Sequence, residues 1–308
     1  MSGISVRSWI SSIADRGREL LDLPLSTPQD QFAQLTAMCK DLVSQKGEAR
    51  GTAIAREVVR MWENLPDEDN LRFFKMMQND FSADRAKVTK AAEAFAKDPS
   101  EPNLAVLTHA SEPVRQDLLR KINMAPGGTR AIVDMRETLI GLLKTNRDLE
   151  PLNADMQHLL TSWFNRGFLE LRHIDWDTSA AILEKLIRYE AVHEIQGWDD
   201  LRRRLATDRK CFAFFHPAIP DDPLIFVEVA LVHGLADSVQ ALLAPEIDKA
   251  APETANTAIF YSISNCQAGL KGISFGNFLI KQVVEELKRE FPKLKQFATL
   301  SPIPGFVG

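Results

Sequence analysis

A loop near the end of the 308-residue chain has the composition of a phosphate-binding site. It lies between a predicted strand at 257–264 and a predicted helix at 277–290. A helix N-terminus presents unpaired backbone N–H groups, and glycine lets the backbone approach a phosphate closely. The order of elements therefore favours a pyrophosphate ligand. The residues that we expect to contribute are Gln267, Gly269, Lys271, Gly272, Ile273, Ser274, Phe275, Gly276 and Asn277.

The same loop contains the sequence of a nucleophile elbow, Gly272-Ile-Ser274-Phe-Gly276. In α/β-hydrolases this motif places the serine on a sharp turn directly between a strand and a helix, and the histidine follows the serine in the chain. Here the predicted strand ends too early, and the last histidine is His233. We therefore set the hydrolase interpretation aside.

Charged residues outside the loop leave alternatives open. Arg202, Arg203 and Arg204, with Arg209 and Lys210, could meet phosphate groups, although a solvated helix face is the simpler interpretation. Glu228, on a predicted strand, could act as a base or could face solvent.

The elements around the loop are predicted from short aromatic and β-branched runs. Residues 211–216 and 224–231 form an expected antiparallel hairpin, because the proline- and aspartate-rich segment 217–223 between them is typical of a turn. The strand at 257–264, the loop, the helix at 277–290 and a strand at 296–300 follow. This second half is therefore mixed α and β.

The first two hundred residues carry apolar side chains at three- and four-residue spacing, which is typical of successive helices. Breaks are predicted at Pro28, at Pro66, at Asp98-Pro99-Ser100 and at Pro126-Gly127-Gly128. The helical positions that define the pattern are Ala53, Val58, Met61, Trp62, Leu71, Phe74, Met77, Leu104, Leu107, Leu118 and Leu119. The sequence predicts an α+β protein with an all-α domain at 1–148 and a mixed domain at 149–308.

Composition narrows the class of protein. A net charge of −5 gives no global attraction to nucleic acid, and no run is long and apolar enough to span a membrane. The three cysteines are widely spaced, so neither a disulfide framework nor a metal site is expected. Arginines near the N-terminus resemble a transit peptide, but Asp15 and Glu19 count against one, and we expect a first helix there and a cytoplasmic location.

Several stretches in the last fifty residues occur together in one known family. The matching stretches are Phe260-Tyr-Ser262-Ile-Ser264, Gln267, Gly269-Leu-x-Gly272, Phe278-Leu-Ile-Lys281, Val283 to Leu287, Glu290-Phe-Pro292 and Leu300-Ser301-Pro-Ile-Pro-Gly305-Phe306. In order and spacing they closely resemble the malonyl-CoA decarboxylase family. Weaker similarity extends back to Ser162, so most of the chain is covered.

The resemblance implies a helical N-terminal domain used in self-association, as a dimer or tetramer, followed by a catalytic domain of the N-acetyltransferase type. It implies conversion of malonyl-CoA to acetyl-CoA and carbon dioxide, with no metal or organic cofactor. The family's catalytic serine falls on Ser301, and Ser262 matches a second serine of the site. Without the resemblance, Ser301 would be interpreted as a turn serine beside prolines.

Two departures from the family bear on activity. Ser274 stands where some members carry a glutamate. The family's catalytic histidine lies well beyond the serine, whereas this sequence ends seven residues after Ser301, so we expect a truncated form with little or no activity. His193, His216 and His233 do not replace it convincingly. An acyl-CoA N-acyltransferase and an inactive CoA-binding or oligomerisation module remain the alternatives.

Overall fold

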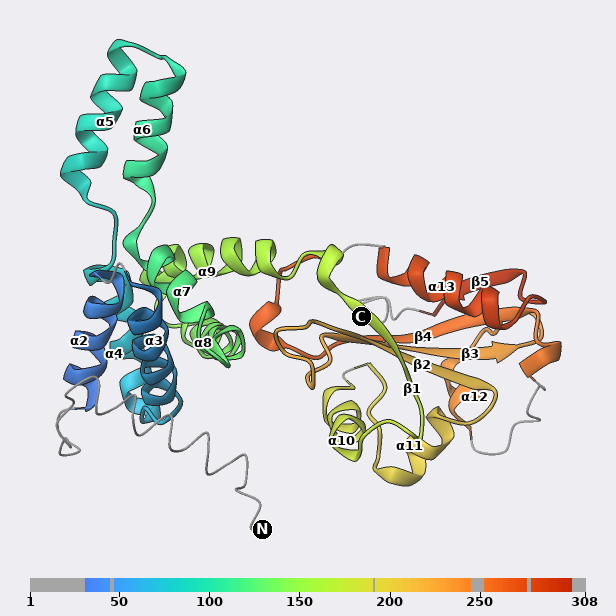
Figure 1. Cartoon of the computed structure of the whole chain (residues 1–308). Helices are drawn as coiled ribbons and strands as arrows, with labels where there is room; N and C mark the ends of the chain where they lie inside the picture. The colour runs from blue at the N-terminus through green and yellow to red at the C-terminus, as the bar shows by residue number, and fades with distance from the viewer. Residues whose placement is uncertain (1–30, 45–46, 191, 245–251, 276–277, 301–308) are drawn as a thin grey trace, which may run out of the picture. The chain divides into compact units, whose positions relative to one another are not determined.

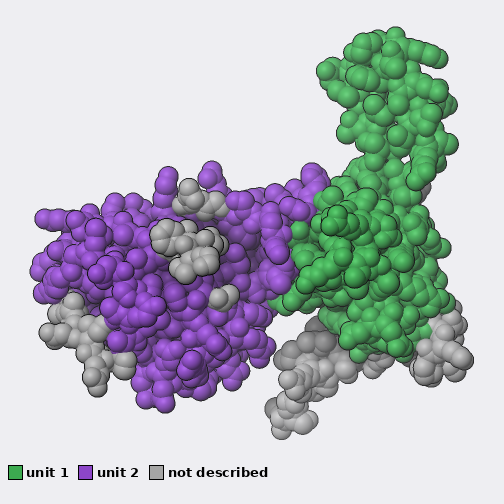
Figure 2. Space-filling model, turned by 180° about the vertical axis from the view of Figure 1, so that it is seen from behind, with its two compact units in different colours: residues 1–156 green, residues 157–308 purple. Residues whose placement is uncertain are grey.

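The computed structural model divides into two compact units, residues 1–156 and 157–308, which Figure 2 colours separately. The division falls inside one helix, and each unit is described by itself. The expected first helix and the predicted break at Pro28 lie outside the described residues. The sequence-based boundary at 148–149 stays a prediction. The structure describes residues 31–44, 47–190, 192–244, 252–275 and 278–300.

The described part of the first unit is helical (Figure 1). Apolar residues at helical spacing fill its core, with Val58, Phe74, Met77, Leu118 and Leu119 all buried. Helix α9 begins in this unit and ends in the second. The helices are α2 (Gln31–Ser44), α3 (Glu48–Glu63), α4 (Asp67–Asp80), α5 (Arg85–Lys97), α6 (Glu101–Ser111), α7 (Val114–Asn123), α8 (Gly128–Leu142), the short η2 (Arg147–Leu149) and α9 (Glu150–Trp163).

The predicted breaks in the described part of this unit separate helices. Pro66 is the N-cap of α4, and Ser100 is the N-cap of α6. At the third break, Gly127 has φ +78° and a Cβ on Gly128 would lie 2.0 Å from the carbonyl oxygen of Ile122. Both glycines are therefore required, one for its backbone angle and one for the close approach of α8 to α7.

Helix α6 is present as predicted but is not part of the core. None of its residues is buried, and Leu104 and Val106 are 40% and 57% exposed. In α5 only Ala91 is buried. The apolar spacing around Leu104 therefore identified a helix correctly, while its burial depends on neighbours that the sequence does not reveal.

The second unit contains a five-stranded sheet with the order β1-β2-β3-β4-β5. Neighbouring strands are antiparallel except β4 and β5, which are parallel. The predicted hairpin, third strand and fourth strand are confirmed as β2 with β3, β4 and β5. The strands are β1 (Glu170–Ile174), β2 (Arg209–Phe215), β3 (Ile225–Val232), β4 (Thr257–Asn265) and β5 (Gln296–Thr299).

Helices cover both faces of this sheet (Figure 1). One face packs against α10 (Ala180–Tyr189) and α11 (Trp198–Arg204), whose Leu183, Leu186 and Leu201 share a core with Phe226. The other face carries α13 (Phe278–Glu290), with Leu279, Val283 and Leu287 buried. The predicted helix and its apolar face are therefore confirmed. The short elements are α12 (Val239–Leu243), η3 (Arg166–Phe168), η4 (Pro252–Thr254) and η5 (Ala268–Leu270).

Strand β1 lies where the sequence predicted only helices. Its five residues, ELRHI, carry charged side chains, and only Ile174 is buried. The strand pairs on one side with β2 and lies at the edge of the sheet. An exposed edge strand of this kind lacks the apolar alternation by which strands are recognised.

Candidate functional site

A cavity of about 240 Å³ lies against the face of the sheet that carries α13. Its floor includes Val227 of β3 and Ile263 of β4, which are directly paired across the two strands. Its other wall is formed by the end of the glycine-bearing loop and the start of α13, including Ile273, Phe275 and Leu279. The cavity is therefore mostly apolar and opens beside the loop in which the sequence predicted a phosphate site.

Strand β4 offers a strand edge next to this cavity. Strand β5 pairs with β4 only from Thr257 to Phe260, and the last bond joins the Leu300 N–H to the Phe260 carbonyl at 2.9 Å. From Tyr261 to Asn265, no strand of the described chain pairs with β4 on the β5 side. The register with β3 also shifts here, because Tyr261 is an extra residue between two paired positions.

The loop is held at both ends by long-range hydrogen bonds. Gln267 is buried, and its Nε2 donates to the carbonyl oxygen of Pro223 at 2.9 Å. Gly269 is buried in η5, and Lys271, which follows it, is exposed. Gly272 has φ +80°, which favours glycine, and its carbonyl accepts from Gln157 Nε2 of α9 at 3.1 Å.

The remaining loop residues reach the cavity. Ile273 is buried, Phe275 is half-buried and Ser274 is exposed, and all three line the cavity. Strand β4 ends at Asn265, with η5 between it and Ser274, so Ser274 does not follow a strand as an elbow nucleophile would. The predicted site residues Gly276, Asn277 and Ser301 lie outside the described residues.

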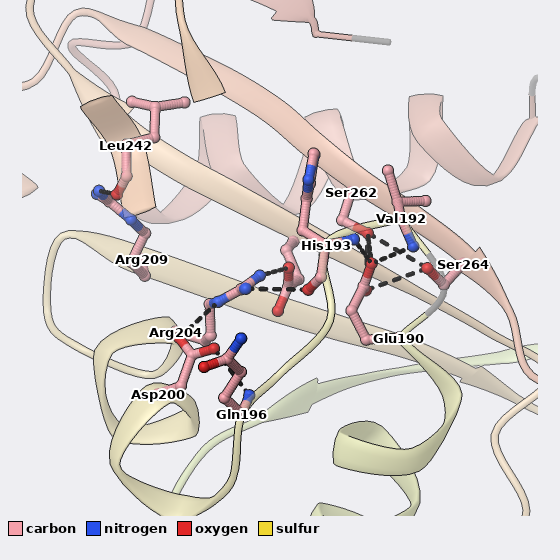
Figure 3. A network of polar contacts seen from close by, with 11 residues as sticks. Glu190, Val192, His193, Gln196, Asp200, Arg204, Arg209, Leu242, Ser262 and Ser264 are labelled. Carbon is pink, nitrogen blue, oxygen red and sulfur yellow. Dashed lines mark hydrogen bonds and ion pairs between the residues drawn. The ribbon is translucent and has the colours of Figure 1, made fainter. Parts of the chain in front are cut away.

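Ser262 and Ser264 point to the opposite face of the sheet, because alternate residues of a strand face opposite sides. Both hydroxyls bind Glu190, the residue that ends α10 (Figure 3). Ser262 Oγ lies 2.8 Å from both carboxylate oxygens of Glu190, and Ser264 Oγ lies 3.1 Å from Oε2. The structure thus brings Ser262 together with a buried carboxylate and not with the loop.

Glu228 neighbours this cluster and is fully buried. Its Oε2 accepts from Arg204 Nη1 at 2.7 Å, and its Oε1 has no hydrogen-bond partner among the described residues. Burial raises the pKa of Glu228 to about 8, although the Arg204 charge opposes the shift and Glu190 supports it. The expectation that Glu228 could face solvent is therefore wrong.

The predicted basic cluster is likewise largely internal. Arg203 forms a two-bond ion pair with Asp208 at 2.8 and 3.1 Å, and Arg209 binds the same carboxylate at 2.8 Å. Burial works to raise the pKa of Asp208, but the Arg203 hydrogen bond and the two positive charges outweigh it and lower that pKa. Arg204 also binds Asp200 (Figure 3). Arg203, Arg204 and Arg209 are therefore neither a solvated face nor free for phosphate, whereas Arg202, whose side chain is 73% exposed, fits the solvated helix face.

The three histidines have separate surroundings. The backbone of His193 donates to Glu190 and accepts from Arg204, while its buried Nε2 has no hydrogen-bond partner in the part of the chain that the structure describes. His216 bonds the carbonyl of Trp163 through Nε2 and accepts from Ala218 N–H through Nδ1. His233 Nε2 lies 3.3 Å from the Thr254 hydroxyl. None lies among the residues that line the cavity.

Sequence reasoning missed Glu190, which organises the buried cluster. Glu190 lies 72 positions before Ser262, in a segment without a motif. The one signal available was the pair of serines at alternate positions of an otherwise apolar strand, since buried hydroxyls require partners.

A helical first unit, a mixed sheet and a loop-bounded apolar cavity define a two-part protein with a candidate site for a phosphate-bearing, partly apolar ligand. Two family models match the chain from residue 81 onward. The malonyl-CoA decarboxylase N-terminal domain matches residues 81–164, and the malonyl-CoA decarboxylase C-terminal domain matches residues 167–308. The chain belongs to the malonyl-CoA decarboxylase family.

Sequence comparison with individual proteins supports the same family assignment. The chain is 35% identical over 244 residues to a mitochondrial malonyl-CoA decarboxylase of the goose Anser anser anser, and 36% identical over 206 residues to that of Rattus norvegicus. These matches cover 75% and 65% of the chain but only 48% and 42% of the relatives, so the chain spans about half the length of the curated relatives it matches.

Solved structures are similar as well. The malonyl-CoA decarboxylase of Rhodopseudomonas palustris matches with a TM-score of 0.84 and 51% identity, covering 89% of this chain and 67% of that one. The enzyme of Agrobacterium vitis matches with a TM-score of 0.84 and 52% identity, with the same two coverages. The predicted family is therefore confirmed, together with the helical first part and the mixed second part.

Proposed function

We propose that the protein to which this chain belongs converts malonyl-CoA to acetyl-CoA and carbon dioxide, without a metal or organic cofactor. The observation that carries the proposal is the apolar cavity between the glycine-bearing loop and the edge of β4 that no other described strand pairs. A CoA thioester has a pyrophosphate at one end and an extended arm with two amides at the other. The loop suits the pyrophosphate, and a strand edge suits the amides.

The shape of the sheet supports a catalytic domain of the N-acetyltransferase type. Parallel β4 and β5 pair only as far as Phe260, and β4 carries a bulge at the point where the pairing ends. A strand that ends early beside a bulged neighbour supports binding of an extended ligand along the edge of β4. Lys271, exposed beside the loop, can add a positive charge near the phosphates.

The chemistry requires no covalent intermediate. The bond between the carboxylate carbon and the α carbon breaks, carbon dioxide leaves, and the electron pair forms an enolate on the thioester. A proton then adds to the α carbon, which gives acetyl-CoA. A donor fixed near the thioester oxygen stabilises the enolate, and we propose that Ser301 is this donor.

Ser262 has a different proposed role. Ser262 is only 2% exposed, and its hydroxyl already donates a hydrogen bond to Glu190. We therefore propose that Ser262 supports the site from behind the strand and does not contact the substrate. Ser274, which lines the cavity, takes the position where some members carry glutamate, and we propose that it contacts the ligand through its hydroxyl.

The test measures binding and turnover separately. We expect CoA to bind the purified 308-residue chain in calorimetry. We expect acetyl-CoA to form from malonyl-CoA with the intact protein, by which we mean the product of the full-length reading frame that contains this chain. A Ser301→Ala change in the intact protein should lower kcat about a hundred- to a thousandfold, as loss of one oxyanion donor does elsewhere. Binding without any decarboxylation would contradict the proposed reaction, and unchanged kcat in the variant would contradict the role of Ser301.

An acyl-CoA N-acyltransferase is the second candidate, because the same site would bind the same coenzyme. Its proposed base was Glu228, but this side chain is buried against Arg204 on the face away from the cavity. An amine substrate could not reach it without opening the core. Acetyl transfer to amines in the absence of decarboxylation would restore this candidate.

We also propose a homo-oligomer, a dimer or tetramer, formed through the helical unit. Leu104 and Val106 on α6 and Val114 at the start of α7 are exposed apolar residues that support this. The cytoplasm remains the proposed compartment, and the curated animal relatives are named mitochondrial. No helix among the described residues could cross a membrane. Sedimentation of the intact protein would test the assembly.

A further inference from the structure

The carboxylate of Glu190 accepts hydrogen bonds from strand β4, far away in the sequence, and from the backbone that directly follows Glu190. On one side it accepts from the hydroxyls of Ser262 and Ser264 of β4. On the other side it accepts from the backbone N–H groups of Val192 at 2.8 Å and His193 at 2.7 Å (Figure 3). Glu190 itself is only 6% exposed. A buried carboxylate with this many donors is a strong and specific anchor.

The anchored serines lie in the part of β4 that β5 leaves unpaired. Strand pairing with β5 ends at Phe260, whereas Ser262 and Ser264 follow it on the face that packs against α10 and α11. Ile263, between them, faces the cavity on the opposite side. Glu190 therefore holds the back of the same short segment whose front forms the floor of the candidate site.

A strand segment with one neighbour is held by half as many ladder hydrogen bonds as a central segment and yields more easily. Binding an extended arm requires the edge of this segment to stay in one register, because each amide of the ligand must meet a backbone group. The Glu190 hydrogen bonds supply the restraint that β5 does not supply here. If the edge is already ordered in the free protein, binding does not have to restrict its conformational freedom, and the ligand binds more tightly.

We propose that Glu190 is a positioning residue, which holds Tyr261–Asn265 of β4 in the conformation that binds the extended arm of a CoA thioester. The inference rests on the proposed function, since it needs a CoA ligand at this edge. Glu190 touches no substrate and acts through Ser262 and Ser264. It therefore affects the affinity for the ligand and has no direct contact with the reacting atoms.

The test replaces the carboxylate by an amide. In Glu190→Gln one acceptor oxygen becomes an NH2 group that faces hydroxyl and N–H donors, so part of the anchor is lost while the side-chain volume is kept. We expect CoA to bind the variant about tenfold more weakly, which corresponds to roughly 1.4 kcal/mol. We expect KM for malonyl-CoA to rise similarly while kcat of the intact protein changes little.

The matched control is Glu194→Gln, the same change at an exposed glutamate of the same loop. It should bind CoA like the unchanged protein. A second variant, Ser262→Ala with Ser264→Ala, removes the two hydroxyls and keeps Glu190. It should weaken CoA binding by a similar factor and speed amide hydrogen exchange at Cys266, whose N–H donates to the Leu224 carbonyl oxygen at the end of this segment.

The outcomes separate the two ideas. If the unchanged chain binds no CoA, the proposed function is wrong and this inference falls with it. If the unchanged chain binds CoA and folded Glu190→Gln binds it equally well, only the role of Glu190 is overturned. If Glu190→Gln does not fold, the double serine variant decides in the same way, and normal affinity in that variant would overturn the inference.

Discussion

The buried carboxyl of Glu228 couples protonation to the stability of the second unit. Arg204 is its one hydrogen-bonding partner among the described residues, and Glu190 adds negative charge nearby. Removing one member of such a pair leaves a buried charge uncompensated, which typically costs about 3–5 kcal/mol. Glu228 therefore belongs to the internal support of the sheet and not to a set of exposed catalytic groups.

We expect Glu228→Gln to change how stability depends on pH. Burial raises the pKa of Glu228 to about 8 in the folded protein, above its ordinary value near 4.5. Between these two values the folded state holds a proton that the unfolded state has lost. The free energy of unfolding therefore falls as pH rises through this window, by up to about 1.4 kcal/mol per pH unit for one proton.

Glutamine cannot titrate, so the variant should lack this part of the slope. Urea unfolding at several pH values from 5 to 8.5, with the tryptophan fluorescence of the second unit as the signal, measures the difference between the two proteins. Parallel curves for the variant and the unchanged protein would show that Glu228 does not bind a proton on folding.

At the scale of the element, the glycine-bearing loop depends on one backbone angle. Gly272 has φ +80°, and a Cβ there would lie 3.4 Å from Gln157 Nε2. Other L-residues pay about 1–2 kcal/mol for this left-handed conformation. The loop between η5 and the cavity can therefore keep this conformation only with glycine at position 272, and any other residue there requires local distortion.

We expect Gly272→Ala to lower the free energy of unfolding by about 1 kcal/mol and to weaken CoA binding, because the loop must shift. Gly141→Ala is the matched control. Gly141 lies in α8, has an ordinary φ and no neighbouring atom within 4 Å of a Cβ, so alanine should stabilise it by about 0.5–1 kcal/mol. Equal effects of the two changes in chemical denaturation would contradict this account.

Much of the second unit could be predicted from the sequence, because its signals are local. Strand β4, the loop and α13 carry apolar runs and glycines that act within a few residues of one another. Strand β1 and Glu190 could not be predicted in this way. The strand is an exposed edge, and the partners of Glu190 become its neighbours only when the sheet forms. The burial of the arginines near Asp208 could not be predicted for the same reason.

At the scale of the whole molecule, His216 fixes the last turn of α9, the helix in which the division between the units falls. Its ring lies tilted against the ring of Phe164, at a centroid distance of 4.7 Å, and its Nε2 bonds the Trp163 carbonyl at 3.2 Å. Burial lowers the pKa of His216, although the bond to Trp163 opposes the shift. Protonation would also break the bond from Ala218 N–H.

We expect stability to fall as pH drops below about 6.5, where the unfolded histidine gains a proton that the folded one resists. The loss should continue down to the lowered pKa of the folded state. In His216→Gln this slope should be absent, although the variant is less stable overall. Thermal unfolding from pH 7.5 to 5 compares the two proteins, and an unchanged slope in the variant would exclude His216 as the titrating group.

The extra residue in β4 has a consequence for how this sheet can change in evolution. Because Tyr261 has no counterpart on β3, every position after it faces the side opposite to the one that a regular ladder would give. A regular ladder that kept Tyr261 would pair Ser262 with Val227, which would bring the serines into the cavity and turn Ile263 toward Glu190. The bulge and the extra residue should therefore be kept or lost together, even in lineages where the side chains of this strand drift.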